Sequence, residues 1–502
     1  MNKVRDRVAL WSTILLLGLA WPALAHVGSP NVFFEGEAGP HPIRVVIRPP
    51  PVVPGLAQIS VRVKNTGPHQ VQVLPVKWDA GRKGAPPPDS ATLVRGETNL
   101  YSAELWFMTT GAYGVLVRVE SSAGKGEAIV PITALATRRL VMTPLMTGVL
   151  SGLGLLLVAL LASIARAALS ESLLEPGSLP TRRRLRGGRL AALAAMIFIT
   201  GALYGGYRWW GAVDRHFVSN RLYRSPQTTL TLSERDGHRA LRLAIDDPRW
   251  ERHQRSPLIP DHGKLMHLFL VRQPGLDVFA HLHPSGRDDR LFDTALPPLP
   301  EGEYLTFADI THETGASQTL TGRVRIGPGA SPASWHHSEI SPDPTDAWHA
   351  SHPVGTGAAP SPSVPSQPYQ VRWEALSSVV AGVDLSLSFQ VVDANGQPAP
   401  LELYMGMPGH AVILHEDSSV FTHLHPQGTA SMASLMTFAK RELDINAVRR
   451  LDDLICGVDT QESRVHFPYA FPKPGRYRVW FQAKARGQIV TGAFEVTVAA
   501  PS

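Results

Sequence analysis

Histidines occur twice in the same arrangement, as a His-Leu-His-Pro tetrapeptide at residues 281–284 and again at residues 423–426. A further histidine precedes each copy, His267 before the first and His410 before the second. Two histidines at positions i and i+2 of a strand point to the same face, and a third on the neighbouring strand can join them. Imidazole is the commonest metal ligand in proteins. The sequence therefore predicts two three-histidine metal sites, formed by His267, His281 and His283 and by His410, His423 and His425.

Two β-hairpins are expected to position these clusters. A turn centred on Pro274 would place His267 opposite His281. A one-residue slip would send His267 to the other face of the sheet, so the register matters. The predicted face of the first hairpin also carries Phe269, Phe279 and His283. The second hairpin is expected to turn over residues 415–418. Its corresponding face carries His410, Val412, Phe421, His423 and His425.

Neighbouring side chains could complete or tune either site. Asp309 and Gln482 each stand five residues after the tyrosine of a Gly-x-Tyr strand. Asp309 could bind the first metal or orient one of its histidines, as carboxylates behind metal-bound imidazoles commonly do. Met407 precedes the second cluster and offers a thioether that suits Cu(I), although methionines more often pack in protein cores.

The ligand type limits the choice of metal. Three imidazoles suit copper, zinc or nickel, and an exported location with nearby methionines favours copper over zinc or another divalent metal. The alternative is that the histidines only form hydrogen bonds in a half-buried sheet. The third histidine and the duplication favour metal binding over that alternative.

The N-terminus, residues 1–25, is typical of a secretory signal peptide. It has a basic start, an apolar stretch over residues 8–20 and a small-residue cleavage site at Ala23-Leu24-Ala25. Cleavage there would leave His26 as the first residue. Its α-amine and imidazole could chelate Cu(II) as a histidine brace, with His41 or His69 supplying another imidazole.

Two apolar segments, residues 140–165 and 190–210, are each long enough to span a bilayer. Their interiors contain no Asp, Glu, His or Lys, so they are expected to anchor the protein rather than to conduct ions. The positive-inside rule makes the arginine-rich loop between them, residues 166–189, cytoplasmic. We therefore expect a bacterial inner-membrane protein with both soluble parts on the periplasmic side.

Alternating strand-length segments separated by Gly, Pro and Asn predict a mainly β protein. We expect three immunoglobulin-like β-sandwich modules, the last two being divergent repeats. Helical periodicity predicts an insertion over residues 429–454. Residues 329–367, rich in Pro, Ser, Gly and Ala, are expected to form a flexible linker whose histidines, including His349, are solvated. The three modules would occupy residues 26–136, 218–328 and 368–500.

Composition and motifs exclude several other functions. The chain carries a net charge of +6, but its densest basic cluster lies between the two apolar segments, which argues against a nucleic-acid partner. A single cysteine, Cys456, excludes an internal disulfide and a CxxC redox motif. The sequence has no phosphate-binding glycine loop, no HExxH motif and no nucleophile elbow. Nothing requires an enzyme, although copper on three histidines could support oxygen chemistry.

The last module carries four motifs in order: Gly409-His410, His423-Leu424-His425-Pro426, Pro474-Gly475-Arg476-Tyr477, and Gln482. In these it resembles a class of bacterial exported β-sandwich domains linked to heavy-metal and copper handling. The first copy departs from the pattern, with Met266, Glu301 and Asp309 in place of the glycine, the proline and the glutamine. Residues 26–136, with Pro54-Gly55 and the stretch 100–106, are similar to YtkA/FixH-type domains.

The resemblance implies metal handling, in agreement with the histidine clusters. The sequence thus predicts a membrane-anchored periplasmic copper-binding protein for resistance, storage or delivery, with a periplasmic metal chaperone or a membrane complex as partner. The alternatives are an assembly factor that binds protein partners through its β-sandwiches, and a copper-dependent oxidase.

Overall fold

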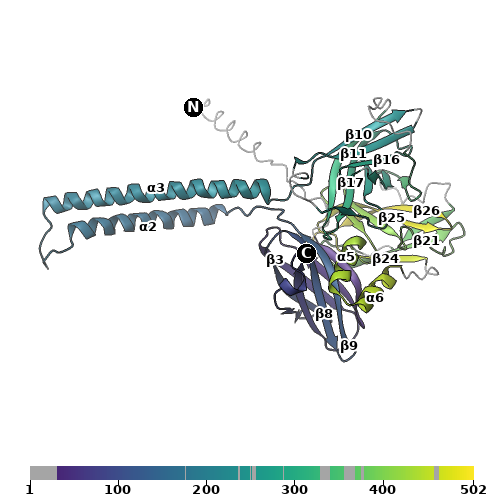
Figure 1. The fold of residues 1–502 in the computed structure, drawn as a ribbon, viewed down its shortest axis with the longest axis horizontal. Helices are drawn as coiled ribbons and strands as arrows, with labels where there is room; N and C mark the ends of the chain where they lie inside the picture. The colour runs from purple at the N-terminus through teal and green to yellow at the C-terminus, as the bar shows by residue number, and fades with distance from the viewer. Residues whose placement is uncertain are drawn as a thin grey trace. The chain divides into compact units, whose positions relative to one another are not determined.

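The computed structural model shows a mainly β protein with two long helices (Figure 1). The chain divides into two compact units, residues 135–224 and the remainder. The expected signal peptide and His26 lie outside the described residues. The structure describes residues 31–175, 177–235, 238–248, 250, 256–286, 288–327, 340–354, 368–374, 378–456 and 463–501.

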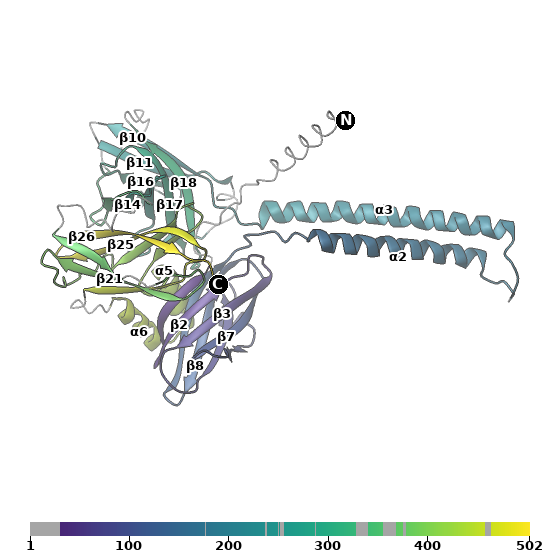
Figure 2. The same cartoon turned by 180° about the vertical axis from the view of Figure 1, so that it is seen from behind.

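The smaller unit contains α2 (Pro144–Ser170) and α3 (Arg182–Asn220), which lie side by side (Figures 1 and 2). Both helices are long and apolar enough to cross a membrane. Threonines cap their N-termini, with Thr143 accepting from Met146 N and Thr181 from Arg184 N. Five arginines of the expected cytoplasmic segment, residues 166–189, lie in the first turns of α3: Arg182, Arg183, Arg184, Arg186 and Arg189.

Two sheets form the first β unit of the larger body. Alternation along the strands buries Ile43, Val45 and Ile47 completely. One sheet has the order β1 (Val32–Ala38), β2 (His41–Arg48), β3 (Gly55–Val63), β7 (Leu100–Phe107) and β6 (Thr92–Leu93), and the other β5 (Asp89–Ser90), β4 (Gln70–Lys77), β8 (Gly111–Ser121) and β9 (Gly124–Ala134).

The second β unit again packs two sheets around a shared core. One has the order β10 (Thr228–Arg235), β11 (His238–Ile245), β16 (Leu291–Ala295) and β15 (Ser285–Gly286). The other has the order β12 (Leu258–Ile259), β17 (Gly302–His312), β13 (His267–Gln273), β14 (Val278–Leu282) and β19 (Ala347–Ala350), with β18 (Ser317–Ile326) also on β17.

Part of the predicted linker is therefore a strand. β19 pairs with β14 and buries His349, whose burial lowers its pKa to about 4. The expectation of a solvated His349 is wrong. A short segment added to an exposed sheet edge gains backbone hydrogen bonds whatever its local composition.

The third β unit repeats the plan. One sheet has the order β20 (Tyr369–Trp373), β21 (Leu385–Asp393) and β24 (Arg464–Tyr469), and the other β23 (Phe421–Leu424), β22 (His410–His415), β25 (Gly475–Ala485) and β26 (Gln488–Val498). A tyrosine in each β unit donates its hydroxyl to the carbonyl four residues upstream: Tyr113 to Thr109, Tyr304 to Pro300 and Tyr477 to Lys473.

Two helices, α5 (Met432–Glu442) and α6 (Ile445–Cys456), fall in the segment where a helical insertion was expected. α5 lies beside β9 of the first β unit (Figure 1), and α6 lies against β1 of the same unit. Phe438 on α5 packs edge-on against Trp78, with ring centroids 5.5 Å apart. Backbone bonds between β1 and the segment before α5 add to this contact, including Thr429 N to Phe33 O at 3.0 Å. The insertion thus joins the first β unit to the third.

The second and third β units pack face to face through the sheets that carry the histidine hairpins. Phe307 stacks on Phe421 with ring centroids 4.1 Å apart, and Phe279 stacks on Trp480 at 4.7 Å. All four side chains belong to one buried apolar cluster drawn from both units. Since the histidines alternate along the same strands with period two, both histidine faces point into this interface.

Candidate metal centre

The first hairpin presents the predicted face with a different register. Phe269 pairs with His281, so the hairpin is centred on Gly275 rather than on Pro274. A shift of one residue in the centre moves every pair by two residues and leaves the face unchanged. The predicted pairing of His267 with His281 is therefore wrong, and the predicted common face is right. In the second hairpin Val412 pairs with His423.

The first predicted triad comes together. His267, His281 and His283 are buried, and one ring nitrogen from each lies within 4.8 Å of the others. The closest pair is His267 Nδ1 and His281 Nε2, at 3.1 Å. This spacing allows the three rings to share one ion.

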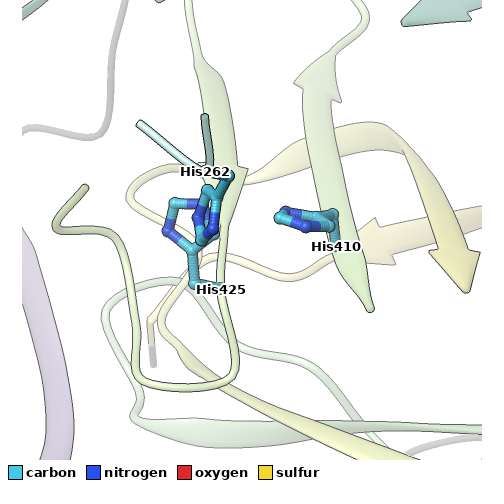
Figure 3. Close-up of side chains that lie close together, drawn as sticks. All are labelled: His262, His410 and His425. Atoms are coloured by element: carbon cyan, nitrogen blue, oxygen red, sulfur yellow. The ribbon is translucent and has the colours of Figure 1, made fainter. Parts of the chain in front are cut away.

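The second triad also comes together and gains a fourth histidine. A nitrogen of His262 lies within 4.8 Å of nitrogens of His410 and His425 (Figure 3). His423 belongs to the same group, since its Nε2 is 3.3 Å from His410 Nδ1 and its ring centroid 4.6 Å from that of His425. His262 comes from a tight turn of the other β unit, and no motif in the sequence singled it out.

The two triads lie side by side in one continuous cluster of imidazole rings, called the pocket below. The ring centroids of His267 and His423 are 5.5 Å apart, and those of His281 and His410 are 6.4 Å apart. His262 spans both groups, 6.0 Å from His267 and 5.2 Å from His410. A single seven-histidine centre therefore lies between the second and third β units.

Backbone carbonyls determine where two of the rings carry their proton. His267 Nε2 is 3.1 Å from Asp261 O, and His410 Nε2 is 3.2 Å from Tyr404 O. A carbonyl oxygen can only accept, so each Nε2 must be the protonated nitrogen. The Nδ1 lone pair of each ring then faces the pocket.

The middle histidine of each triad is oriented by the opposite β unit. His281 Nδ1 donates to Gln482 Oε1 at 2.9 Å, and Gln482 Nε2 donates to the hydroxyl of Thr491. His423 Nδ1 lies 3.3 Å from Asp309 Oδ2. Asp309 was predicted to serve the first site, but its carboxylate reaches the second. In both rings Nε2 faces the pocket.

The last histidine of each triad also directs its Nδ1 atom to an acceptor outside the pocket. His283 Nδ1 lies 3.0 Å from Asp346 Oδ1, and His425 Nδ1 donates to Ala430 O at 3.2 Å. The segment that supplies Asp346 was expected to be a flexible linker. A neighbouring carboxylate, Asp343, joins His283 and Asp346 as a third group of close ligand atoms.

Five imidazoles thus direct their protons outward and their lone pairs inward, and the sixth, His423, presents its Nδ1 to Asp309. At 3.1 Å, the facing nitrogens of His267 and His281 repel one another unless a cation or an extra proton lies between them. Within the described part of the chain, three inward Nε2 atoms also have no hydrogen-bond partner, those of His262, His283 and His425. Leaving such a group unsatisfied costs about 1–3 kcal/mol.

Burial keeps six rings of the pocket neutral. Desolvation, reinforced by neighbouring imidazoles, lowers the pKa of these six, because a charged ring would be buried among other rings. For His262 and His425 the pKa falls to about 4, and it lies well below 6.5 for His267, His281, His410 and His423. These six rings are therefore neutral at pH 7, as metal binding requires.

Three carboxylates surround the pocket in different states. Burial raises the pKa of Asp309 to about 7, although Thr319 donates a hydrogen bond to it. Burial also raises the pKa of Asp261, whose Oδ1 accepts from the backbone at the start of α5. For Asp343, burial would raise the pKa, but hydrogen bonds, chiefly from Lys264, lower it to about 2.

The remaining candidate ligands lie elsewhere or are only partly placed. Met407 is fully buried and closes a tight turn by backbone bonds with Tyr404, so its role as a ligand stays a prediction. His41 uses both ring nitrogens, toward Gly124 O and Asn65. That leaves His69, 5.5 Å from His41 between ring centroids, as the imidazole of the described first β unit that could join a brace with His26.

Comparison with known proteins adds little about function. A family model described as a domain of unknown function (DUF8832) matches residues 364–500, which cover the third β unit. None of the curated proteins matches the chain. Among solved structures, a tetra-tandem repeat in the extending region of a large adhesion protein shares 10% identity over 93% of this chain and 83% of its own, with a TM-score of 0.15. Salmonella alpha-2-macroglobulin reacted with methylamine shares 8% identity over 95% of this chain and 24% of its own, with a TM-score of 0.17. At these TM-scores neither similarity supports an argument.

Proposed function

We propose that this chain is a membrane-anchored copper-binding protein that holds its metal between the second and third β units. The observation that carries the proposal is the direction of the ring protons. Five histidines donate outward to carbonyl, amide or carboxylate oxygens, and His423 presents its Nδ1 to the Asp309 carboxylate at 3.3 Å, so the remaining ring nitrogens converge in a buried cluster. A purely structural histidine cluster would instead pair its nitrogens with one another as donor and acceptor.

The composition of the pocket favours copper over the alternatives, zinc or another divalent ion. Imidazole nitrogen binds copper and zinc, but its complexes with copper are the more stable. A buried pocket of neutral ligands also favours an ion of low charge, since an unneutralised buried charge costs several kcal/mol. Cu(I) meets this condition, and the carboxylates of Asp261 and Asp309 are available to balance the charge.

The remainder of the chain suits an exported anchor. The helices α2 and α3 would hold the protein in the inner membrane, with the β units in the periplasm. The tyrosine hydrogen bond repeated in each β unit supports an immunoglobulin-like origin for all three. Storage, resistance or delivery of copper, with a periplasmic chaperone as donor or acceptor, would follow from such a site.

Metal stoichiometry tests this proposal. The detergent-solubilised full chain would be loaded with Cu(I), Cu(II) or Zn(II), and its bound metal measured by native mass spectrometry. We expect two copper ions, with one lost in His281→Ala/His283→Ala and the other in His423→Ala/His425→Ala. His349→Ala is the matched control, because it removes a buried imidazole outside the pocket. Absence of tight metal binding to the parent would reject the proposal.

A further inference from the structure

The two β units that form the pocket carry the same tight turn just before their first histidine strand. Backbone bridges close it between Asp261 and Lys264 and between Tyr404 and Met407. The second residue of each turn has a left-handed backbone, with φ of 51° at His262 and 53° at Met405. A glycine follows each of them, with φ of 77° and 78°. His262 and Met405 thus occupy equivalent positions in the two repeats.

The two repeats exchange groups reciprocally across the interface. Asp309 lies opposite His267 in its own sheet, and Gln482 lies opposite His410. Yet Asp309 contacts His423 of the third β unit, and Gln482 contacts His281 of the second. Each repeat therefore supplies one group to the other repeat's triad, as expected if the two repeats are related by an approximate two-fold axis.

His262 follows the same exchange. It belongs to the second β unit, but its ring lies against His410 and His425 of the third (Figure 3). His262 also lies near the backbone of Met405, so the two turns face each other. If the axis that relates Asp309 to Gln482 also relates His262 to Met405, then Met405 belongs beside the triad formed by His267, His281 and His283.

We propose that Met405 caps the first triad as His262 caps the second, so that the pocket holds two unlike copper sites. This inference rests on the proposed function and adds to it a ligand and a division of roles. The first site would have three nitrogens and one sulfur, and the second four nitrogens. A thioether is a soft ligand that prefers Cu(I), whereas four imidazoles also suit Cu(II) and Zn(II). The chain would then bind Cu(I) at the first site in preference to divalent ions.

X-ray absorption of the Cu(I)-loaded full chain tests the proposal. We expect a sulfur shell equivalent to one sulfur per two copper ions in the parent. Met405→Leu should remove it and weaken Cu(I) binding at one site by about tenfold or more in a chelator competition, with Zn(II) binding at the other site unchanged. Met407→Leu is the matched control, because it makes the same change two residues away in the same turn. His262→Met should double the sulfur signal.

Each result distinguishes this inference from the function on which it rests. Two bound copper ions with only nitrogen ligands, or a sulfur shell that survives Met405→Leu, would overturn the inference and leave copper binding intact. A sulfur shell lost in Met407→Leu instead would assign the ligand to Met407 and also overturn it. No copper bound by the parent would reject the proposed function itself. The gain of sulfur in His262→Met does not depend on the folding of the Met405 variant.

Discussion

Acidification should destabilise the metal-free protein steeply, because six histidines of the pocket are held neutral by burial. In the folded protein the pKa values of these histidines lie below the unfolded value of 6.5, and those of His262 and His425 fall to about 4. Protonation therefore favours the unfolded chain. The stability that depends on these rings is present above pH 6.5 and is lost as the pH falls below it.

Two carboxylates act in the opposite direction. The folded pKa of Asp309, about 7, lies above its unfolded value of 3.8, and that of Asp261 is raised as well. Both take up protons in the folded state as the pH falls. On unfolding near pH 5, the six histidines each take up about one proton and the two carboxylates each release about one, so the chain takes up about four protons in all. The unfolding free energy should then fall by about 5 kcal/mol per pH unit where these groups titrate, near pH 5.

Denaturant titrations of the metal-free full chain at pH 7.5, 6.5, 5.5 and 5.0 measure this slope, with fluorescence of the buried interface tryptophan Trp480 as one probe. Copper should move the loss of stability to lower pH, because the ion competes with protons for the same nitrogens. Asp309→Asn should steepen the slope by about 1.4 kcal/mol per pH unit. An unfolding free energy that stays level from pH 7.5 to 5.0 would refute the account of neutral, inward-facing rings.

Three substitutions test other parts of the structure. Gln482→Leu removes the acceptor of His281 Nδ1, so metal affinity at the first triad should fall about 10–100-fold. Asp309→Asn should instead weaken metal binding at the second triad. Equal losses of affinity at both triads in a competition assay would contradict this assignment. Phe421→Ala should cost about 3–5 kcal/mol in denaturant unfolding, because the ring is buried in the interface. Tyr477→Phe should cost about 1 kcal/mol through loss of one hydrogen bond, and an unchanged denaturation midpoint would show that this bond is not stabilising.

Local periodicity was enough to predict the faces of the two hairpins. Side chains alternate with period two along a strand, so the histidines and their aromatic neighbours had to share a face once the strands formed. The register of the first hairpin depended on the turn geometry at Gly275, which the sequence suggests only weakly. Asp309 was correctly chosen as a residue near the histidines, but its partner was not, since the contact to His423 arises from packing of one repeat on the other.

The merging of the two sites could not be predicted from the pattern. Nothing local indicates that two histidine faces, separated by more than a hundred residues, should face each other. The same packing brings His262 into the pocket from the opposite repeat. Asp346 and β19 were missed because a Pro- and Ser-rich composition resembles a linker even where a few residues add to a sheet edge.

Anomalous diffraction from crystals of the copper-loaded chain tests the central claim most directly. We predict two copper peaks between the second and third β units, one bound by His267 Nδ1 and the Nε2 atoms of His281 and His283, the other by the matching nitrogens of His410, His423 and His425. Copper found only on the surface, or inward nitrogens that hydrogen-bond to one another with no metal between them, would contradict it.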